Sequence, residues 1–226
     1  MFMTLLLRVD ADLAAATRAL PTGAGAGGAG SAARWSLNGG FDVIIVRRPN
    51  ELDGALKELR TAAVHAGHTM GIDLEWRPDF QPGSNNPAAL IQLAAGKVCL
   101  LLQTTFLGFP DVLRRFLRDP NYTFVGCNWL SADEAKFQRS FGFGRYDFGH
   151  FDDLKDLVAR SRFSVPSTGV GALAQSLLGV MLPKDKQVTL SDWSAPDLTP
   201  TQIQYAALDA LAVHRIHRAL ANAGLV

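Results

Sequence analysis

Runs of apolar residues predict that the strands cluster in the first half of the chain. The β-branched run DVIIV follows Phe41, and after it Asn50 is a candidate N-cap for a helix with apolar residues at positions 52, 56, 59 and 63. A second strand, TMGIDLEW, comes next. A strand, a helix and a strand in this order predict a parallel pair joined by a right-handed crossover.

Three further apolar runs predict strands, namely AALIQLAA and KVCLLLQ, joined by a Gly-Lys turn, and YTFVG, which follows a helix around DVLRRFLR. Beyond about residue 131, apolar residues recur at spacings of three and four. This spacing predicts helices at SADEAKFQRSFG, DDLKDLVARS and GVGALAQSLLG, and from Thr199 onward. Strands early and helices late predict an α/β fold with a mixed sheet.

The first 40 residues differ in composition from the rest of the chain. Residues 21–32 are almost all small, and such residues bury too little apolar area to offset the entropy of ordering, so we expect a flexible linker there. The preceding segment, LAAATRAL, fits a short helix or an organellar transit peptide, although Asp10 and Asp12 argue against the transit peptide. We therefore expect a flexible extension over residues 1–40 and one domain over residues 41–226.

The charge balance excludes a strongly basic protein that binds duplexes by charge alone, because 22 Lys and Arg face 21 Asp and Glu. Any contact with nucleic acid must be local. Cys99 and Cys127 are too few for a disulfide framework or a zinc ribbon, which favours an intracellular compartment, the nucleus or cytoplasm, with an organelle as the alternative. No apolar run approaches the length of a membrane-spanning helix, so no membrane partner is expected.

Asp73 and Glu75 are separated by one residue in a strand of otherwise apolar character. Strand alternation puts both side chains on one face. Two uncompensated carboxylates beside a core repel each other and lose hydration, so their presence calls for a counter-charge, which a divalent cation supplies. The alternative is a strand end whose acids simply face water.

Asp133 is a weaker candidate when it is considered alone. Ser131 and Glu134 predict a capping box around it, shortly after the strand YTFVG. Acids in the first turn of a helix are favoured by the macrodipole without any further function.

Tyr205 and Asp209 lie four residues apart in the terminal helix, so they share one face. The start of this helix is predicted by Thr199, by Pro200 at the first helical position and by Gln202 in a capping box. The alternative for the pair is a core tyrosine whose hydroxyl binds a nearby aspartate.

Together, three motifs in order resemble the exonuclease domain of the Werner-syndrome helicase and its stand-alone relatives, within the DEDD superfamily that includes ribonuclease D. They are Asp73-Leu-Glu75-Trp76, Asp133 with Lys136 three residues on, and Tyr205-Ala-Ala-Leu-Asp209. The stretch LLGVMLPKDKQVTLSDWS, followed by LTPTQIQYAALDA, extends the resemblance, which covers roughly residues 41–222.

Three positions refine this resemblance. A sister branch has histidine where this chain has Gln204, so the tyrosine branch is favoured. The chain has CNWLSA where the family often has a glycine-rich turn, and Leu208 where threonine is common. Both departures leave the carboxylates intact.

The resemblance implies a ribonuclease-H-like fold, a mixed β-sheet flanked by α-helices, and a metal-dependent 3′-5′ exonuclease that releases nucleoside 5′-monophosphates. It assigns two divalent cations, Mg²⁺ or Mn²⁺, to Asp73, Glu75, Asp133 and Asp209, with Asp73 bridging both ions, and it assigns the orientation of the attacking water to Tyr205. The implied partner is a 3′ end of DNA or RNA, with DNA favoured. A helicase or repair protein acting in trans is a further candidate.

Substrate contacts are expected from side chains around the motifs. Leu74 and Trp76 would press on the terminal base, and the phosphates would be bound by Arg77, Lys136, Lys184 and Lys186. The alternative is a solvated lysine cluster beside a tryptophan that belongs to the core.

Three other functions compete with the exonuclease. A catalytically inactive binding module on the same fold would have lost a metal ligand, whereas all four acids and Tyr205 are present. An endonuclease of the ribonuclease-H type would cut a circular strand, on which an exonuclease cannot start. A domain with acids merely dispersed on its surface would show no Mg²⁺-dependent thermal shift.

Overall fold

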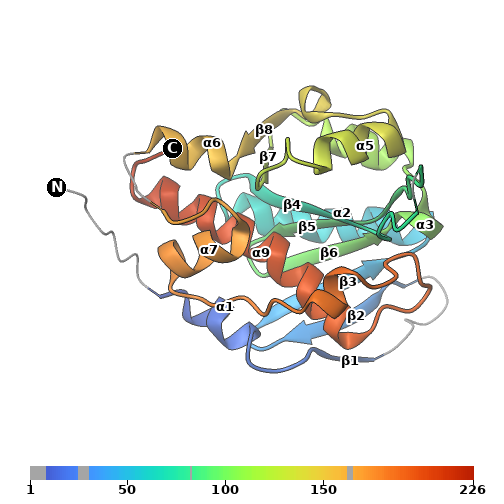
Figure 1. Cartoon of the computed structure of the whole chain (residues 1–226), viewed down its shortest axis with the longest axis horizontal. Coiled ribbons are helices and arrows are strands. Elements are labelled where there is room, and N and C mark those ends of the chain that lie inside the picture. Colours follow the sequence, from blue (N-terminus) through green and yellow to red (C-terminus); the bar gives the residue numbers. More distant parts are fainter. Residues whose placement is uncertain (1–8, 25–30, 82, 162–164) are drawn as a thin grey trace.

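Eight strands form one mixed sheet in the part of the chain that the computed structural model describes, residues 9–24, 31–81, 83–161 and 165–226 (Figure 1). Their order across the sheet is β1-β2-β3-β6-β5-β4-β7-β8. In chain order they are β1 (Thr22–Ala24), β2 (Ala33–Leu37), β3 (Phe41–Val46), β4 (Thr69–Trp76), β5 (Ala88–Ala95), β6 (Val98–Gln103), β7 (Thr123–Gly126) and β8 (His150–Asp153).

The predicted hairpin of β5 and β6 is confirmed, but the predicted direct pairing of β3 with β4 is wrong. The hairpin lies between these two strands, with β6 parallel to β3 and β5 antiparallel to β4. The strands β3 and β4 therefore run in the same direction without sharing hydrogen bonds. The reason is burial, because every residue of β5 is buried and such a strand needs neighbours and covered faces on both sides.

Helices cover both faces of the sheet. Helix α9 (Pro200–Asn222) packs on one face and α2 (Pro49–Val64) on the other, each with its own apolar core cluster (Figure 1). This arrangement confirms the predicted α/β class. The remaining helices of the described residues are α1 (Ala11–Ala16), α3 (Thr104–Leu107), α4 (Asp111–Leu117), α5 (Asp133–Phe141), α6 (Leu154–Arg160), α7 (Val170–Leu173) and α8 (Lys186–Thr189), with a 3-10 turn η1 (Arg145–Asp147) and a π-helical turn η2 (Ala174–Leu178).

The helix starts show one confirmed cap and two corrections. The Thr199–Gln202 capping box of α9 is present, with Pro200 at the first helical position. Helix α2, in contrast, begins at Pro49, and the carboxylate of Glu51 accepts hydrogen bonds from the backbone N–H groups of residues 47 and 48, so Asn50 is not the N-cap.

The predicted capping box of Ser131 and Glu134 is also wrong. Helix α5 has Ala132 at its N-cap position. The carboxylate of Glu134 instead accepts hydrogen bonds from Trp129 Nε1, at 2.7 Å, and from the backbone N–H of Arg145. Glu134 therefore connects the loop before α5, which contains Trp129, to the segment after α5, which contains Arg145. It does not cap its own helix.

The sequence predicted a flexible extension before Phe41, but the described residues of this region pack as part of the fold. Strand β2 pairs with β3, and β1, inside the predicted linker, pairs with β2. Helix α1 packs on α9, where the Gln204 amide donates to the carbonyl oxygens of Ala16 and Ala19 at 2.9 and 2.8 Å. The packed unit thus includes residues ahead of position 41, while linker residues 25–30 lie outside the described residues.

Strand β8 lies in a region predicted to be helical. It pairs in parallel with β7 at the edge of the sheet, and its last residue, Asp153, caps helix α6 through the backbone N–H of Lys155. The segment GVGALAQSLLG forms α7 and then the π-helical turn η2, which is followed by Gly179 as its C-cap. Among the described residues, none of the helices has the length and apolar character needed to cross a membrane.

Candidate active site

Asp73 and Glu75 lie on the half of β4 that has only one strand neighbour. The pairing of β4 with β7 covers Thr69, Met70 and Gly71 and then stops, whereas β5 stays paired with β4 up to Trp76. Both acids are half-buried and face α9, while the intervening Leu74 points to the opposite face. The sheet is thus open on one side at the position where the two carboxylates stand.

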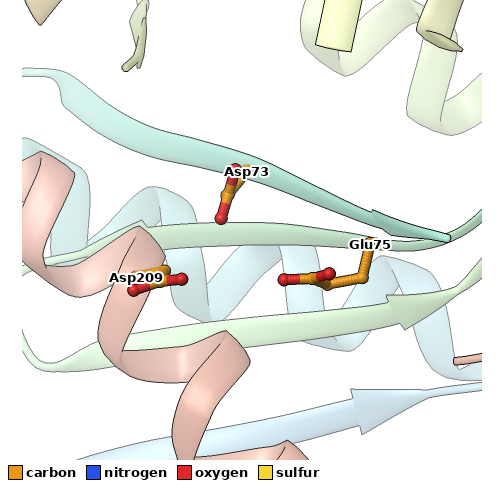
Figure 2. Close-up of side chains that lie close together, drawn as sticks. All are labelled: Asp73, Glu75 and Asp209. Carbon is orange, nitrogen blue, oxygen red and sulfur yellow. The ribbon is translucent and has the colours of Figure 1, made fainter. Parts of the chain in front are cut away.

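Asp209 reaches the same place from α9, which lies unusually close to β4. A Cβ atom at Gly71 would be 2.2 Å from the carbonyl oxygen of Ala210, so only glycine allows this approach. Among the described residues, carboxylate oxygens of Asp73, Glu75 and Asp209 lie within 4.8 Å of one another. Figure 2 shows the three side chains directed toward one another, and we call them the acid cluster.

Burial raises the pKa of every member of the acid cluster. It raises the pKa of Asp73 to about 7 and, with the added charge of Asp73, the pKa of Asp209 to about 8. The pKa of Glu75 is well above its usual value, because burial is reinforced by the charges of the neighbouring aspartates. Three crowded carboxylates resist ionisation because their charges repel one another. A hard divalent cation neutralises such charges and prefers oxygen ligands, so these residues fit a Mg²⁺ or Mn²⁺ site.

Asp133 is close to the acid cluster but stands outside it. It is the first residue of α5, and burial together with the charge of Asp73 raises its pKa to about 8. Its own charge also raises the pKa of Glu75. The structure therefore brings three of the four predicted ligands together and places the fourth within electrostatic reach.

The loop before Asp133 is held by Asp153, which the sequence analysis did not single out. The Asp153 carboxylate accepts hydrogen bonds from the backbone N–H groups of Asn128 and Trp129, at 2.9 and 2.8 Å. Asn128 has φ of 55°, a left-handed conformation that asparagine tolerates better than most residues. The doublet Asp152-Asp153, which ends β8, was the signal available in the sequence, but it resembles a solvated helix start.

Tyr205 lies one turn before Asp209 on the same face of α9. Its hydroxyl donates a hydrogen bond to the Asp209 carboxylate, which lowers the pKa of Asp209. Burial and the three nearby carboxylates raise the pKa of Tyr205 far above its usual value. The phenol therefore stays neutral and can orient a water molecule, but it cannot act as a base.

Two predicted substrate contacts lie elsewhere in the structure. Leu74 is 3% exposed and packs in the core cluster on the α2 side of the sheet. Lys136 is also 3% exposed, and its ammonium group donates to Asp79 Oδ2 at 3.0 Å and to the backbone oxygen of Asn86 at 2.7 Å. Strand alternation accounts for Leu74, and the hydrogen bonds to Asp79 and Asn86 account for Lys136, so neither presents a group to a substrate here.

Lys136 also lies over the ring of Trp76, with its ammonium 5.0 Å from the ring centroid. It thus holds the half-buried Trp76, which packs against the same core cluster as Leu74 on the α2 side of the sheet. The other three predicted contacts, Arg77, Lys184 and Lys186, are exposed. The charge of Lys184 lowers the pKa of Asp209, so this lysine lies within electrostatic reach of the acid cluster.

Two carboxylates on the central strand β4 and a third on α9 converge beside a mixed sheet, which is the arrangement that the resemblance to ribonuclease-H-like exonucleases predicts. The sequence family described as 3′-5′ exonuclease matches residues 43–224, and the chain belongs to this family.

Known proteins agree with this assignment. The chain is 32% identical over 160 residues to the bifunctional 3′-5′ exonuclease/ATP-dependent helicase WRN of Mus musculus, covering 70% of this chain and 11% of that protein. It is 28% identical over 153 residues to a 3′-5′ exonuclease of Arabidopsis thaliana, covering 67% and 52%. The chain thus spans about half or less of these relatives.

Among solved structures, RNase D of Escherichia coli, an exoribonuclease involved in structured RNA processing, is similar in fold. The TM-score is 0.64 at 22% identity, over 80% of this chain and 46% of that one. This similarity supports the ribonuclease-H-like architecture.

Proposed function

We propose that this protein hydrolyses the terminal phosphodiester bond at the 3′ end of a nucleic-acid strand and releases nucleoside 5′-monophosphates. The observation that carries the proposal is the acid cluster, because its three carboxylates converge within 4.8 Å in a chain of the 3′-5′ exonuclease family. The relatives named above are longer proteins, so the activity of the whole relative cannot be transferred to this chain. The proposal therefore rests on the residues of this chain itself.

Asp73, Glu75 and Asp209 would hold two divalent cations together with Asp133. The ions, Mg²⁺ or Mn²⁺, would supply Lewis-acid stabilisation of the attacking and leaving oxygens and lower the pKa of a bound water. The raised pKa values of the carboxyls support this assignment, because cation binding favours their ionised forms. Asp133, the first residue of α5, is the fourth proposed ligand.

Tyr205 would orient the attacking water. Its neutral hydroxyl is one helical turn from Asp209 and already donates to that carboxylate. A hydroxyl can donate one hydrogen bond and accept another, so Tyr205 can link the carboxylate to a water molecule. We expect Tyr205→Phe to lower kcat by roughly 10²-fold, the usual scale for a positioned proton-transfer or orienting group.

DNA is the proposed substrate, because the motifs follow the order seen in the Werner-type exonuclease domain. Arg77, Lys184 and Lys186 would contact phosphates, since these side chains are exposed, while a contact of the half-buried Trp76 with the terminal base stays a prediction. A helicase or repair protein acting in trans stays a prediction.

The experiment is a gel time course with 5′-labelled single-stranded DNA, 3′-recessed DNA and RNA, in Mg²⁺, Mn²⁺ or EDTA. Wild type should give a ladder that shortens from the 3′ end, and Asp73→Ala/Glu75→Ala should give none. A circular single strand serves as the control, because its cleavage would indicate an endonuclease. If no linear strand is cut with either metal, the inactive binding module becomes the better explanation.

A further inference from the structure

Gln92 on β5 is a buried polar side chain with no evident structural partner. It is fully buried, and within the described residues neither its amide nitrogen nor its amide oxygen has a hydrogen-bond partner. Exchanging the two amide atoms would change nothing, because both are unpaired. An unpaired buried amide costs stability, so a purely structural position of this kind favours an apolar residue, as at Leu90 and Ala94 on the same face.

The position of Gln92 in the sheet suggests what the amide is for. In the antiparallel pairing of β4 with β5, Gln92 stands directly opposite Asp73. Residues directly opposite in such a pair point to the same face, with Cβ atoms about 4.5–5.5 Å apart. The Gln92 amide is therefore next to the central carboxylate of the acid cluster and on its side of the sheet.

We propose that Gln92 is a positioning residue, whose amide N–H holds the Asp73 carboxylate once a divalent cation binds at the acid cluster. This inference rests on the proposed function. A carboxylate that binds a metal ion with one oxygen leaves lone pairs directed elsewhere, and donors to those lone pairs fix its orientation. Gln92 supplies such a donor from β5, a central strand in which every residue is buried.

The proposal predicts two effects of opposite sign for Gln92→Met, which removes the amide and keeps an unbranched side chain of similar size. The metal-free protein should melt at the same or a higher temperature, because an unpaired buried amide is lost. The affinity for Mn²⁺ should fall by about tenfold to a hundredfold, the usual effect of losing a partner of a metal ligand. A merely structural role predicts the reverse, a lower melting temperature with unchanged affinity.

Gln204→Met is the matched control. Gln204 is also a buried glutamine, but its amide donates to Ala16 and Ala19, away from the acid cluster. Its replacement should lower the melting temperature and leave Mn²⁺ affinity unchanged. Gln92→Leu is measured beside Gln92→Met, so that poor packing of one apolar side chain does not decide the result.

The experiment is calorimetric titration of the full chain with Mn²⁺, together with thermal melts in EDTA. Weaker Mn²⁺ binding in a Gln92 variant that melts at or above the wild-type temperature supports the proposal. Mn²⁺ affinity within twofold of wild type, or a melting temperature reduced as in Gln204→Met, overturns it. A wild-type protein that binds no Mn²⁺ would instead contradict the proposed function, so the two failures are distinguishable.

Discussion

Gly71 on β4 lies directly under Ala210 on α9, at a distance that leaves no room for a side chain. A Cβ atom at position 71 would be 2.2 Å from the Ala210 carbonyl oxygen and 2.8 Å from the backbone nitrogen of His214. Both neighbours are backbone atoms of a long helix, so they cannot rotate away. This contact sets the height of α9 above the sheet and hence the position of Asp209 over Asp73.

Gly71→Ala should therefore destabilise the protein and spread the acid cluster. We expect a loss of about 2–3 kcal/mol in the free energy of unfolding, the scale of overpacking in a core, with weaker Mn²⁺ binding. Urea denaturation and Mn²⁺ titration measure the two effects. Gly54→Ala is the control, because a Cβ there meets nothing within 4 Å, and in the helix interior it should stabilise by about 0.5–1 kcal/mol. Equal effects at both positions would contradict the account.

The raised pKa values predict an unusual dependence of stability on pH in the absence of metal. Asp73, Asp133 and Asp209 have folded-state pKa values of about 7, 8 and 8, above those of the unfolded chain. The native state binds more protons between roughly pH 4 and 8, so their contribution to stability is present below about pH 4 and is lost as the pH rises through 7 to 8. Melting temperatures in EDTA should fall over this range.

Asp73→Asn should flatten that pH dependence, because asparagine does not titrate. Mn²⁺ binding should have the opposite trend in wild type and strengthen from pH 6 to 8, since the ligands must lose their protons. Melts in EDTA that are equally steep for wild type and Asp73→Asn would show that other groups are responsible.

Substitution of Lys136 distinguishes a structural role of this lysine from a role in substrate binding. Lys136→Met should destabilise the protein by about 1–3 kcal/mol, because the buried ammonium group bridges Asp79 and Asn86. KM should change little in the folded variant. Lys184→Met should instead raise KM and reduce its salt dependence while leaving stability within about 0.5 kcal/mol. If Lys136→Met raised KM with no loss of stability, the original prediction of a phosphate contact would be restored.

Asp153→Ala tests whether the loop before Asp133 depends on one buried carboxylate. The change leaves the backbone N–H groups of Asn128, Trp129 and Lys155 without their acceptor, so we expect a loss of about 2–3 kcal/mol and a lower kcat. Asp156→Ala is the comparison, since Asp156 lies in the first turn of the same helix. A similar small loss in both variants would indicate that only the helix dipole is involved.

Local patterns in the sequence were sufficient for the features that depend on neighbouring residues. Alternation placed Asp73 and Glu75 on one face, and helical spacing with the Thr199 cap placed Tyr205 and Asp209 on another. The hairpin of β5 and β6 followed from two apolar runs and a Gly-Lys turn.

Features that depend on distant residues were not predictable in this way. The insertion of that hairpin between β3 and β4 is set by competition for the buried centre of the sheet. The burial of Lys136 depends on acceptors about 50 residues away, and the role of Asp153 depends on a loop 24 residues earlier. A polar residue buried by tertiary contacts looks, in sequence, like any solvated one.

The most direct test of the central claim is a Mg²⁺ titration of strand shortening, with a 5′-labelled single-stranded oligonucleotide and two variants of α9. Wild type should shorten the strand from its 3′ end only when the metal is present. Asp209→Asn, which keeps the shape but removes a ligand charge, should lose at least about 10³-fold in rate, whereas Gln204→Met should retain activity. Shortening that persists in EDTA, or an Asp209→Asn variant as active as wild type, would contradict a metal-dependent exonuclease built on these acids.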